Sequence, residues 1–336
     1  MNIKPDPALL IAIVYNLKRS TLLDIFQNDD EAEFDSLQTV EAISSAIKSL
    51  GHDVLILEAN KDLPKFLIAQ KIDLVFNIAE GYKGPNREAH VPALLELLSI
   101  PFTGSDSKAL TITLDKGLAK KVVSEAGVAT PRGWLFRDPG QDIPQKFDFP
   151  FIVKPVAEGS SKGISSSSVV HEAHSLQKAV EAILERYNQP ALVEQFVGGR
   201  EFTVGVLEDG NLEVLPPMEI IYLNNEECPI YSYNYKLEWH DFLRYETKPL
   251  LTSALKNKLE NYARKAFRAL GCRDVARFDF RMDTRGNLYF LECNALPGLA
   301  PNWSDLCLIS NAAGISHEAL IQKILSPALK RLRGIS

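Results

Sequence analysis

The stretch from Asp274 to Gly298 limits the possible fold more than any other part of the sequence. It contains two runs of alternating apolar and polar residues, which flank the turn-forming sequence Thr284-Arg285-Gly286-Asn287. Such alternation is typical of strands, so the stretch predicts a β-hairpin with a four-residue loop. One face of the first strand is apolar and is expected to face a core; it consists of Ala276, Phe278, Phe280 and Met282.

The polar face of this hairpin is expected to bring acidic and amide side chains together. Arg277 and Asp279 lie on the polar face of the first strand. On the return strand, alternation predicts that Phe290, Glu292 and Asn294 share one face. A four-residue loop then places Asp279 opposite Glu292, and Arg277 opposite Asn294. Two carboxylates and an amide oxygen are suitable ligands for a hard cation such as Mg²⁺, which bridges phosphates.

The alternative interpretation of this polar face is a solvated surface with a cross-strand ion pair. The turn Pro297-Gly298 comes directly after the return strand and favours a binding site. A glycine at this position allows backbone N–H groups to approach an anion closely.

A second segment has the composition of a phosphate-binding loop. Lys154 lies on the expected strand Phe151–Pro155, and the small-residue loop Glu158–Ile164 follows it. The backbone N–H groups of this loop and the hydroxyls of Ser160 and Ser161 are suitable donors to phosphate. The sequence G-x-x-x-x-G-K-[ST] is absent, so the loop resembles a lid over a nucleotide more than a P-loop. Taken singly, such a loop is also typical of a flexible turn.

A third segment suits the nucleoside part of a nucleotide. The expected strand Ala191–Phe196 contains Glu194, and the chain continues through Gly198-Gly199 to Glu201. Two glutamates in this arrangement can accept hydrogen bonds from adenine and ribose. The alternative is a bend that carries two surface acids.

The first third of the chain alternates strands with helices, which implies a parallel sheet covered by helices. The continuous apolar run Leu9–Tyr15 is typical of a strand buried on both faces. A helix follows it, capped by Asp35 or Ser36 and ended by Gly51. The further elements expected in this part are the strands His52–Leu57 and Asp73–Ile78 and the helix Val91–Leu98.

The rest of the chain predicts two more units. A helix over Leu114–Ala126 opens the second unit, which begins near Ser107 and continues with strands and one helix, Leu176–Tyr187. The third unit is mixed and contains the helix Ser253–Leu270, the hairpin and a terminal helix. We therefore expect three domains, with the boundaries 1–106, 107–197 and 198–336.

The composition is that of a folded protein without a basic surface. A chain of 336 residues is too long to fold around one ordinary hydrophobic core. Its composition, 46% hydrophobic and 24% charged residues, is typical of a globular protein. A net charge of −6 argues against nucleic acid and membrane-surface partners, because both are bound by positively charged protein surfaces. No segment has the features of a signal peptide or membrane span, and the four cysteines lack C-x-x-C spacing. We therefore expect a cytoplasmic protein with reduced thiols.

Taken in order, these segments resemble the ATP-grasp ligases, and most closely the D-alanine–D-alanine ligase family. The residues that carry the resemblance are Lys116, Lys154, Glu158–Gly163, Glu194, Glu201, Arg277, Asp279, Glu292 and Asn294. The resemblance runs from the region of Asp73 to that of Ser316. It implies an α/β (α+β) fold of the ATP-grasp type, with three domains. ATP would lie between two antiparallel sheets, next to an N-terminal parallel α/β domain.

The resemblance also implies a role for each site residue. The expected ATP contacts are Lys116, Lys154, Glu158, Ser160, Ser161, Glu194, Gln195, Phe196 and Glu201. The expected ligands of two Mg²⁺ ions, for which Mn²⁺ can substitute, are Asp279, Glu292 and Asn294. The expected catalytic groups are Arg277, the N–H of Gly298, Ser161 in the closing loop, Lys236 in a mobile loop and Glu33. Family members are commonly dimers, so the resemblance also implies a homodimer.

The sequence departs from the family at the amino-acid end of the site. The family pattern Gly-Gly-x-Ser-x-Glu is missing after the first strand, and the glutamate available for an ammonium group is Glu33. Glu80-Gly81 stands where the family often has His-Gly, and Glu88 remains available after it. Leu237 replaces a tyrosine that usually follows the loop lysine. The residues expected to bind the nucleotide are retained. The sequence therefore predicts a ligase but does not identify the amino acids that it joins.

Three functions are compatible with these residues. The first is an amino-acid ligase, in which a carboxylate attacks the γ-phosphate of ATP and an amine then attacks the acyl phosphate. The second is a ligase that couples an amino acid to a different amine or a carrier in a specialised pathway. The third is a nucleotide-binding regulatory protein without turnover, which the retention of Asp279, Glu292 and Asn294 argues against.

Overall fold

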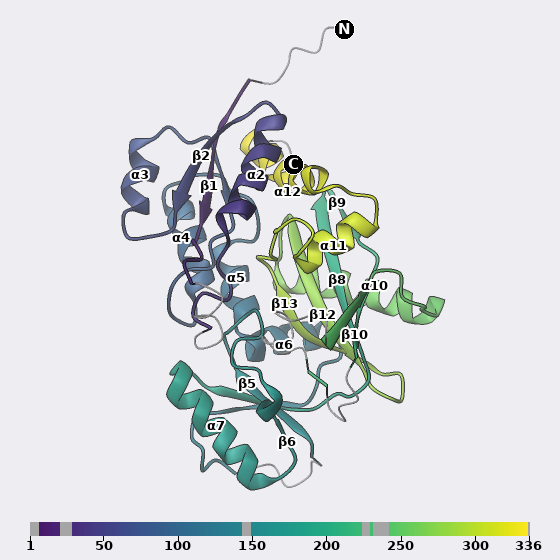
Figure 1. The fold of residues 1–336 in the computed structure, drawn as a ribbon. Helices are drawn as coiled ribbons and strands as arrows, with labels where there is room; N and C mark the ends of the chain where they lie inside the picture. The colour runs from purple at the N-terminus through teal and green to yellow at the C-terminus, as the bar shows by residue number, and fades with distance from the viewer. Residues whose placement is uncertain (1–6, 21–28, 143–148, 224–228, 231–241, 335–336) are drawn as a thin grey trace.

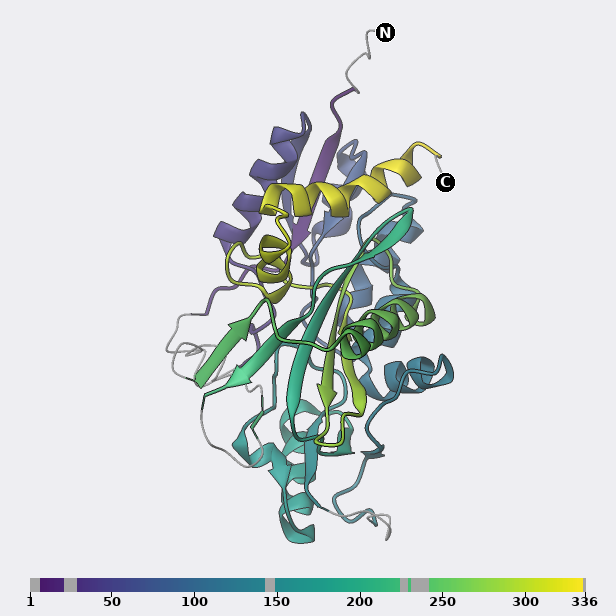
Figure 2. The same ribbon diagram turned by 90° about the vertical axis from the view of Figure 1, so that its right-hand side faces the viewer.

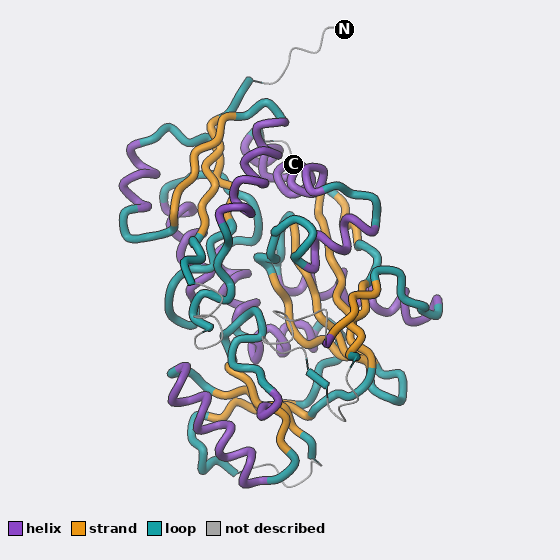
Figure 3. Tube along the Cα trace, viewed as in Figure 1, coloured by secondary structure: helices purple, strands orange, loops and turns teal. Residues whose placement is uncertain are grey.

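The computed structural model describes residues 7–20, 29–142, 149–223, 229–230 and 242–334. These residues form one parallel sheet and two antiparallel sheets, with helices packed against them (Figure 1). Figure 3 shows the smaller antiparallel sheet at one end of the molecule, facing the larger one. The predicted α/β (α+β) architecture of one parallel and two antiparallel sheets is confirmed, whereas the domain boundaries near residues 106 and 197 stay predictions.

The N-terminal sheet is parallel and has the order β2-β1-β3, formed by β1 (Leu10–Tyr15), β2 (Asp53–Glu58) and β3 (Leu74–Asn77). The central strand faces two cores, because Ile11 packs on one side of the sheet and Ala12 on the other. A strand covered on both faces requires the continuous apolar run that the sequence shows.

Helices from both ends of the chain cover this sheet. α3 (Leu63–Ala69) and α4 (His90–Leu97) lie on one face. α2 (Leu37–Ser49) and α12 (His317–Leu332) cover the other, and Figure 2 shows α12 beside the N-terminal part. The cap of α2 is Ser36, whose hydroxyl accepts a hydrogen bond from the N–H of Thr39 at 3.2 Å, rather than Asp35.

The helix predicted over Leu114–Ala126 is confirmed as α6 (Lys116–Glu125), and a further helix that the sequence did not predict, α5 (Ser107–Leu114), precedes it. Asp115 separates them, because its backbone is extended and its carboxylate caps α6 by accepting from the N–H of Leu118. Both helices contribute to the core of the larger antiparallel sheet, through residues such as Leu110 and Val123.

The four-stranded antiparallel sheet has the order β4-β7-β5-β6: β4 (Gly133–Phe136), β7 (Ala191–Gln195), β5 (Phe151–Pro155) and β6 (Val169–Val170). The short helix η2 (Ser166–Ser168) precedes β6, and α7 (Ala173–Tyr187) covers one face. The core between α7 and the sheet includes Phe151 and Val180, both fully buried.

The six-stranded antiparallel sheet has the order β11-β10-β8-β12-β13, with β9 paired to β8. Its strands are β8 (Arg200–Asp209), β9 (Asn211–Val214), β10 (Met218–Tyr222), β11 (Leu243–Glu246), β12 (Val275–Met282) and β13 (Leu288–Asn294). α10 (Ser253–Leu270) covers one face of this sheet. α11 (Asp305–Ala312) packs in a different core cluster, which includes Leu207 of β8. The helix predicted over Ser253–Leu270 is confirmed.

The predicted hairpin exists, and its register near the site is as predicted: Arg277 pairs with Asn294, and Asp279 with Glu292. The turn between the strands has five residues rather than four, and a register shift follows Asp279, where Phe280 pairs with Phe290. This β-bulge offsets the extra turn residue.

The bulge also makes one prediction about the return strand wrong. Phe290 does not share the face of Glu292 and Asn294, because it is fully buried in the core, with its ring centroid 6.1 Å from that of Phe280. Two successive residues of β13 oppose one of β12 at the bulge, so the alternation of faces reverses there.

Candidate active site

A cavity lies between the two antiparallel sheets. Its lining includes six of the residues that the sequence assigned to ATP: Lys154, Ser161, Glu194, Gln195, Phe196 and Glu201. Two of the expected metal ligands, Asp279 and Glu292, close one end of it. Apolar side chains such as Ile152 and Leu291 line the remainder. The cavity therefore combines an apolar slot, suitable for a planar base, with charged groups suitable for phosphates.

A buried carboxylate holds two lysines at the edge of this cavity. Glu194 is 1% exposed, and its two oxygens lie 2.8 Å from Nζ of Lys120 and 2.8 Å from Nζ of Lys154. Burial opposes the ionisation of Glu194, but the two ammonium groups outweigh it and keep the pKa of this carboxyl below its usual value. The Glu194 carboxylate therefore fixes the position of Lys154, which the sequence assigned to phosphate.

A second ion pair lies at the other side of the cavity. Oε2 of Glu201 accepts hydrogen bonds from Nε of Arg281 at 2.8 Å and from the hydroxyl of Tyr222 at 2.5 Å. The guanidinium of Arg281 lies 5.0 Å from the ring centroid of Phe196 and donates to the carbonyl of Val197. These contacts hold the strand ends of both sheets together around the position expected for the nucleoside.

The loop after β5 is held by contacts on both sides. Ser160 and Ser161 have φ values of 48° and 61°, in the left-handed region that non-glycine residues rarely adopt. The ammonium of Lys116 donates to the carbonyl of Glu158, whose carboxylate lies 2.8 Å from Nζ of Lys162. A Cβ on Gly163 would lie 2.6 Å from Cγ of Pro155, so this position requires glycine.

The expected metal ligands converge as predicted on the polar face of the hairpin. Nδ2 of Asn294 lies 3.1 Å from Oδ2 of Asp279, and Nη2 of Arg277 lies 2.9 Å from the same oxygen. Glu292 lies 3.2 Å from Nζ of Lys116. Burial raises the pKa of Asp279, Arg277 lowers it, and the neighbouring Glu292 raises it further, with a net increase. Two half-buried carboxylates that repel each other fit a divalent cation, so the residues present suit Mg²⁺.

A second cavity adjoins the metal ligands and contains the expected catalytic groups Arg277, Gly298 and Glu33. Arg277 is fixed from two sides, since Nη1 also lies 3.0 Å from Oδ2 of Asp305. A Cβ on Gly298 would lie 2.8 Å from Oγ of Ser304, so a side chain here would displace a neighbour. Lys116 and Asn294 complete the wall next to the first cavity.

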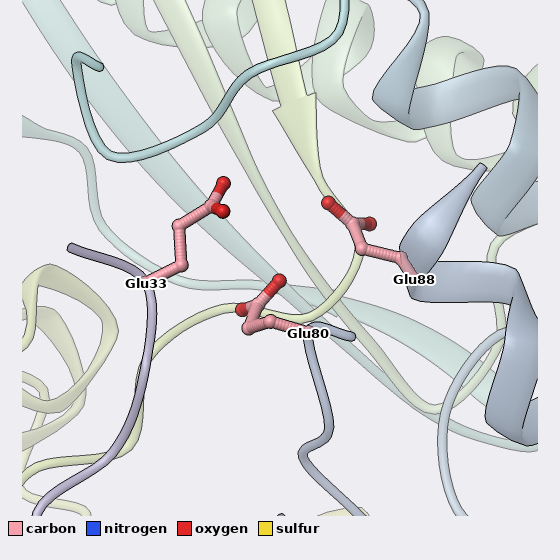
Figure 4. A group of neighbouring side chains, drawn as sticks. All are labelled: Glu33, Glu80 and Glu88. Carbon is pink, nitrogen blue, oxygen red and sulfur yellow. The ribbon is translucent and has the colours of Figure 1, made fainter. Parts of the chain in front are cut away.

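The far wall of the second cavity is acidic. Carboxylate oxygens of Glu33, Glu80 and Glu88 all lie within 4.8 Å of one another, and Figure 4 shows the three side chains pointing toward a common space. Each oxygen of Glu33 lies 2.7 Å from Nη2 of Arg87, and one also accepts from the N–H of Gly159 at 2.7 Å. A residue of the N-terminal part, Glu33, therefore contacts the loop after β5 at the second cavity.

A family model described as "D-ala D-ala ligase C-terminus" matches residues 130–326 of the chain. This chain belongs to the D-alanine–D-alanine ligase family. A D-alanine–D-alanine ligase of Aquifex aeolicus is 34% identical over 295 residues, which cover 87% of this chain and 94% of the relative. The protein y4sG of Sinorhizobium fredii is 35% identical over 308 residues, 88% of each chain.

A solved structure shares the fold of this family member. The D-alanine–D-alanine ligase of Bacillus anthracis, in complex with ATP, gives a TM-score of 0.75 over 98% of this chain and 100% of that chain, at 22% identity. The fold is therefore that of the ATP-grasp ligases, as the resemblance implied. As a member of this family, the protein is an ATP-dependent, ADP-forming ligase.

The structure brings together the residues that the sequence placed in the ligase site, with one exception. Lys236 and its neighbour Leu237 lie outside the described residues. The other candidates line one of the two cavities: Glu33, Lys116, Lys154, Glu158, Ser160, Ser161, Glu194, Gln195, Phe196, Glu201, Arg277, Asp279, Glu292, Asn294 and Gly298. Their roles stay predictions, because position alone does not test a role.

Sequence reasoning missed four residues of the ligase site: Arg87, Lys120, Tyr222 and Arg281. Two of them had a local signal, since Lys120 is one helical turn after Lys116, and Arg281 continues the alternation of Arg277 and Asp279. Arg87 and Tyr222 had none, because each contacts an acid from a distant segment. None of the helices in the described ranges is long and apolar enough to cross a membrane.

Proposed function

We propose that this ligase joins two amino acids by activating the carboxylate of the first as an acyl phosphate, which the amine of the second then attacks. One observation carries the proposal. A single cavity is lined by Arg277, Gly298 and Lys116, by the expected metal ligands Glu292 and Asn294, and by the acidic residues Glu33, Glu80 and Glu88. A carboxylate next to Arg277 with its ammonium at the acidic wall would lie beside the nucleotide cavity.

In this proposal the nucleotide binds between the two antiparallel sheets. Lys154, fixed by Glu194, and Lys116 would contact the phosphates, because each presents an ammonium at a cavity wall. Asp279, Glu292 and Asn294 would hold Mg²⁺, with Mn²⁺ as a substitute. When bound, Mg²⁺ polarises phosphoryl oxygens and offsets the repulsion between a carboxylate and a triphosphate. Backbone and side chains near Phe196 and Glu201 would bind the adenosine.

The groups of the chain also suit the second step. The attack of an amine on the acyl phosphate places negative charge on the carbonyl oxygen. Arg277 and the N–H of Gly298 would donate to this oxygen, and such donors are worth most in a site that excludes water. The loop with Ser160 and Ser161 would exclude water, because Gly159 is tied to Glu33 across the cavity.

A second candidate is a ligase that couples the first amino acid to a different amine or to a carrier. The acidic wall favours this candidate, since Glu80 stands where the family often has histidine and alters the amino-acid pocket. A regulatory protein without turnover remains a third candidate. The retention of both carboxylates, Asp279 and Glu292, opposite each other on the hairpin argues against it.

The test is Mg²⁺-dependent release of ADP from ATP, first with D-alanine alone and then with pools of L- and D-amino acids. Turnover that requires an amino acid and yields a dipeptide supports the first candidate. Turnover that requires an amino acid and an added amine or thiol supports the second. ATP binding without ADP release under any of these conditions would contradict both and favour the regulatory role.

We further propose a cytoplasmic homodimer whose ligands are small amino acids, without nucleic acid or membrane partners. Three buried cysteines with free thiols, Cys272, Cys293 and Cys307, support a reducing compartment. Light scattering of the purified protein measures the oligomeric state, and cell fractionation measures the location. A monomer, or recovery with membranes, would contradict this part of the proposal.

A further inference from the structure

The acidic wall of the second cavity, Glu33, Glu80 and Glu88, contains more negative charge than its protein neighbours offset. The three side chains come from separate segments: the loop before α2, the residue after Ala79 that follows β3, and η1 (Arg87–Ala89). Figure 4 shows that their carboxylates meet although their backbones do not. The question is which of these charges the protein itself neutralises.

Glu33 is neutralised by the protein. The guanidinium of Arg87 lies 2.7 Å from both of its oxygens, and Nζ of Lys162 lies 3.7 Å from one. The same two cations also pair with Glu158: its Oε2 lies 3.4 Å from Nη2 of Arg87 and 2.8 Å from Nζ of Lys162. Two carboxylates therefore face two cations here, and this part of the cavity is balanced.

Glu80 and Glu88 are not neutralised in this way. In the part of the chain that the structure describes, neither side chain has a hydrogen bond or an ion pair. Glu88 is only 8% exposed, and its side chain lines the cavity that contains Arg277 and Gly298. Burial raises the pKa of both carboxyls, and neighbouring acids raise it further. Arg87 lowers the pKa of both carboxyls and Lys116 lowers that of Glu88, but less than burial and the other acids raise it. The buried Glu88 and the half-buried Glu80 thus face the cavity without a directly bonded cation, which a cationic ligand would supply.

The spacing of the three carboxylates suits an ammonium group. Their oxygens lie no more than 4.8 Å apart. An ammonium with three N–H groups, each about 2.8 Å from its acceptor, places the acceptors about 4.6 Å apart. Charge rather than spacing argues against a metal ion here, because an ion bound by Glu33 would lie beside the guanidinium of Arg87, which repels it.

We propose that the amino acid activated by this ligase carries a second cationic group, so that its substrates are diamino acids. One ammonium would donate to the acidic wall, and the two positive charges would offset Glu80 and Glu88. The carboxylate would then point toward Arg277 and Gly298, which line the same cavity. This inference rests on the proposed function, because it names the substrate class of the same site.

The test compares kcat/KM for ADP release with diaminopropionate, diaminobutyrate, ornithine and lysine, each as both enantiomers, against alanine. At least one diamino acid is expected to exceed alanine by about tenfold or more. Glu80→Gln and Glu88→Gln should each lower the ratio of kcat/KM between that diamino acid and alanine by about tenfold. Glu41→Gln, an exposed carboxylate of α2, is the matched control and should leave the ratio unchanged.

Calorimetry gives a second readout that does not depend on turnover. The diamino acid is titrated into the protein loaded with Mg²⁺ and a non-hydrolysable ATP analogue. Binding that is tighter than that of alanine, and weaker in Glu88→Gln, supports the inference even if ADP release fails and the proposed function falls. Alanine bound and used better than every diamino acid would overturn the inference while leaving the ligase function intact. Saturable Mg²⁺ binding lost in Glu88→Gln but kept in Glu292→Gln would also overturn it, in favour of a metal site.

Discussion

Nζ of Lys154 lies 2.8 Å from Oε2 of Glu194, a carboxylate that is 1% exposed. The lysine projects from β5 and the glutamate from β7, adjacent strands of the four-stranded sheet. Because the other oxygen of Glu194 pairs with Lys120, this one carboxylate holds two buried ammonium groups. The cavity between the two antiparallel sheets is therefore bordered by a buried charge cluster that includes two adjacent strands of the small sheet.

Glu194→Gln should destabilise the protein as well as weaken ATP binding. The change leaves two buried ammonium groups without a counter-charge, and breaking a buried pair costs about 3–5 kcal/mol. Urea unfolding measures the loss, and calorimetry with ATP measures the affinity. Glu185→Gln, on the exposed face of α7, serves as control. Unchanged stability with reduced ATP affinity would show that Glu194 contacts the nucleotide rather than supporting the lysines.

Glu88→Gln should flatten the dependence of stability on pH in the ligand-free protein. The folded pKa of Glu88 is raised from 4.5 to about 8, so the folded state binds its proton more tightly than the unfolded state. Stability from this group is fully present below pH 4.5 and is lost as the pH rises through about 8. Urea midpoints of the wild type should therefore fall between pH 5 and pH 8 more than those of the variant, as ~1.4 kcal/mol corresponds to one pKa unit. Parallel curves for the two proteins would contradict a raised pKa.

Glu292→Gln should abolish Mg²⁺-dependent turnover with little change in the fold. The amide keeps the size of the side chain but removes a charge from the metal ligands, and metal catalysis contributes on the order of a thousandfold in rate. ADP release at several Mg²⁺ concentrations measures the effect, with Glu125→Gln at the exposed end of α6 as control. Full activity in Glu292→Gln would exclude this residue as a ligand.

Arg277→Lys should lower kcat by about a hundredfold and change ATP affinity little. Lysine keeps the charge near Asp279 and Asp305 but loses the planar guanidinium that now reaches both. Since the proposed oxyanion forms only during ligation, the loss should appear in kcat rather than in ATP binding. Arg268→Lys on the exposed face of α10 is the control. Equal losses in kcat and ATP affinity would indicate a structural arginine.

Gly298→Ala should reduce ligation, and Ser304→Ala should partly restore it. A Cβ at position 298 would lie 2.8 Å from Oγ of Ser304, which is tighter than side chains normally approach. Removing that oxygen relieves the contact, so steady-state kinetics of the double variant should exceed those of the single variant. An absence of rescue would show that the backbone of Gly298, rather than the space beside it, tolerates no change.

Local patterns predicted the strands, the hairpin and most of the site. These patterns did not predict the length of the hairpin turn or the β-bulge, because the two irregularities offset each other in the register. The hairpin register near Asp279 is right although the turn is longer than predicted, because the bulge before Glu292 cancels the extra residue. The same bulge reverses the face of Phe290, and alternation alone cannot show an insertion in a strand. The helix α5 (Ser107–Leu114) was not predicted, and Asp115 separates it from the predicted helix α6.

The acidic wall shows a second limit. Glu33, Arg87 and Glu158 come from three distant segments, and their ion pairs depend on how the N-terminal sheet docks on the phosphate loop. No local spacing encodes that contact. The residues assigned to ATP line one cavity as expected, because they follow one another on strands and loops of recognisable pattern. The acidic wall was only partly anticipated, because its residues come from separate segments that meet only in the folded chain.

Helix α12 completes the inner core of the parallel sheet, with Ile321 and Ile324 packed in the same cluster as Ile11 and Phe76. The strands of the parallel sheet are synthesised before α12, so one apolar face of the sheet lacks part of its cover until this helix has been translated. A nascent chain paused before α12 would expose that face to chaperones. Folding of the parallel sheet is therefore completed only after a segment far downstream in the sequence has been made.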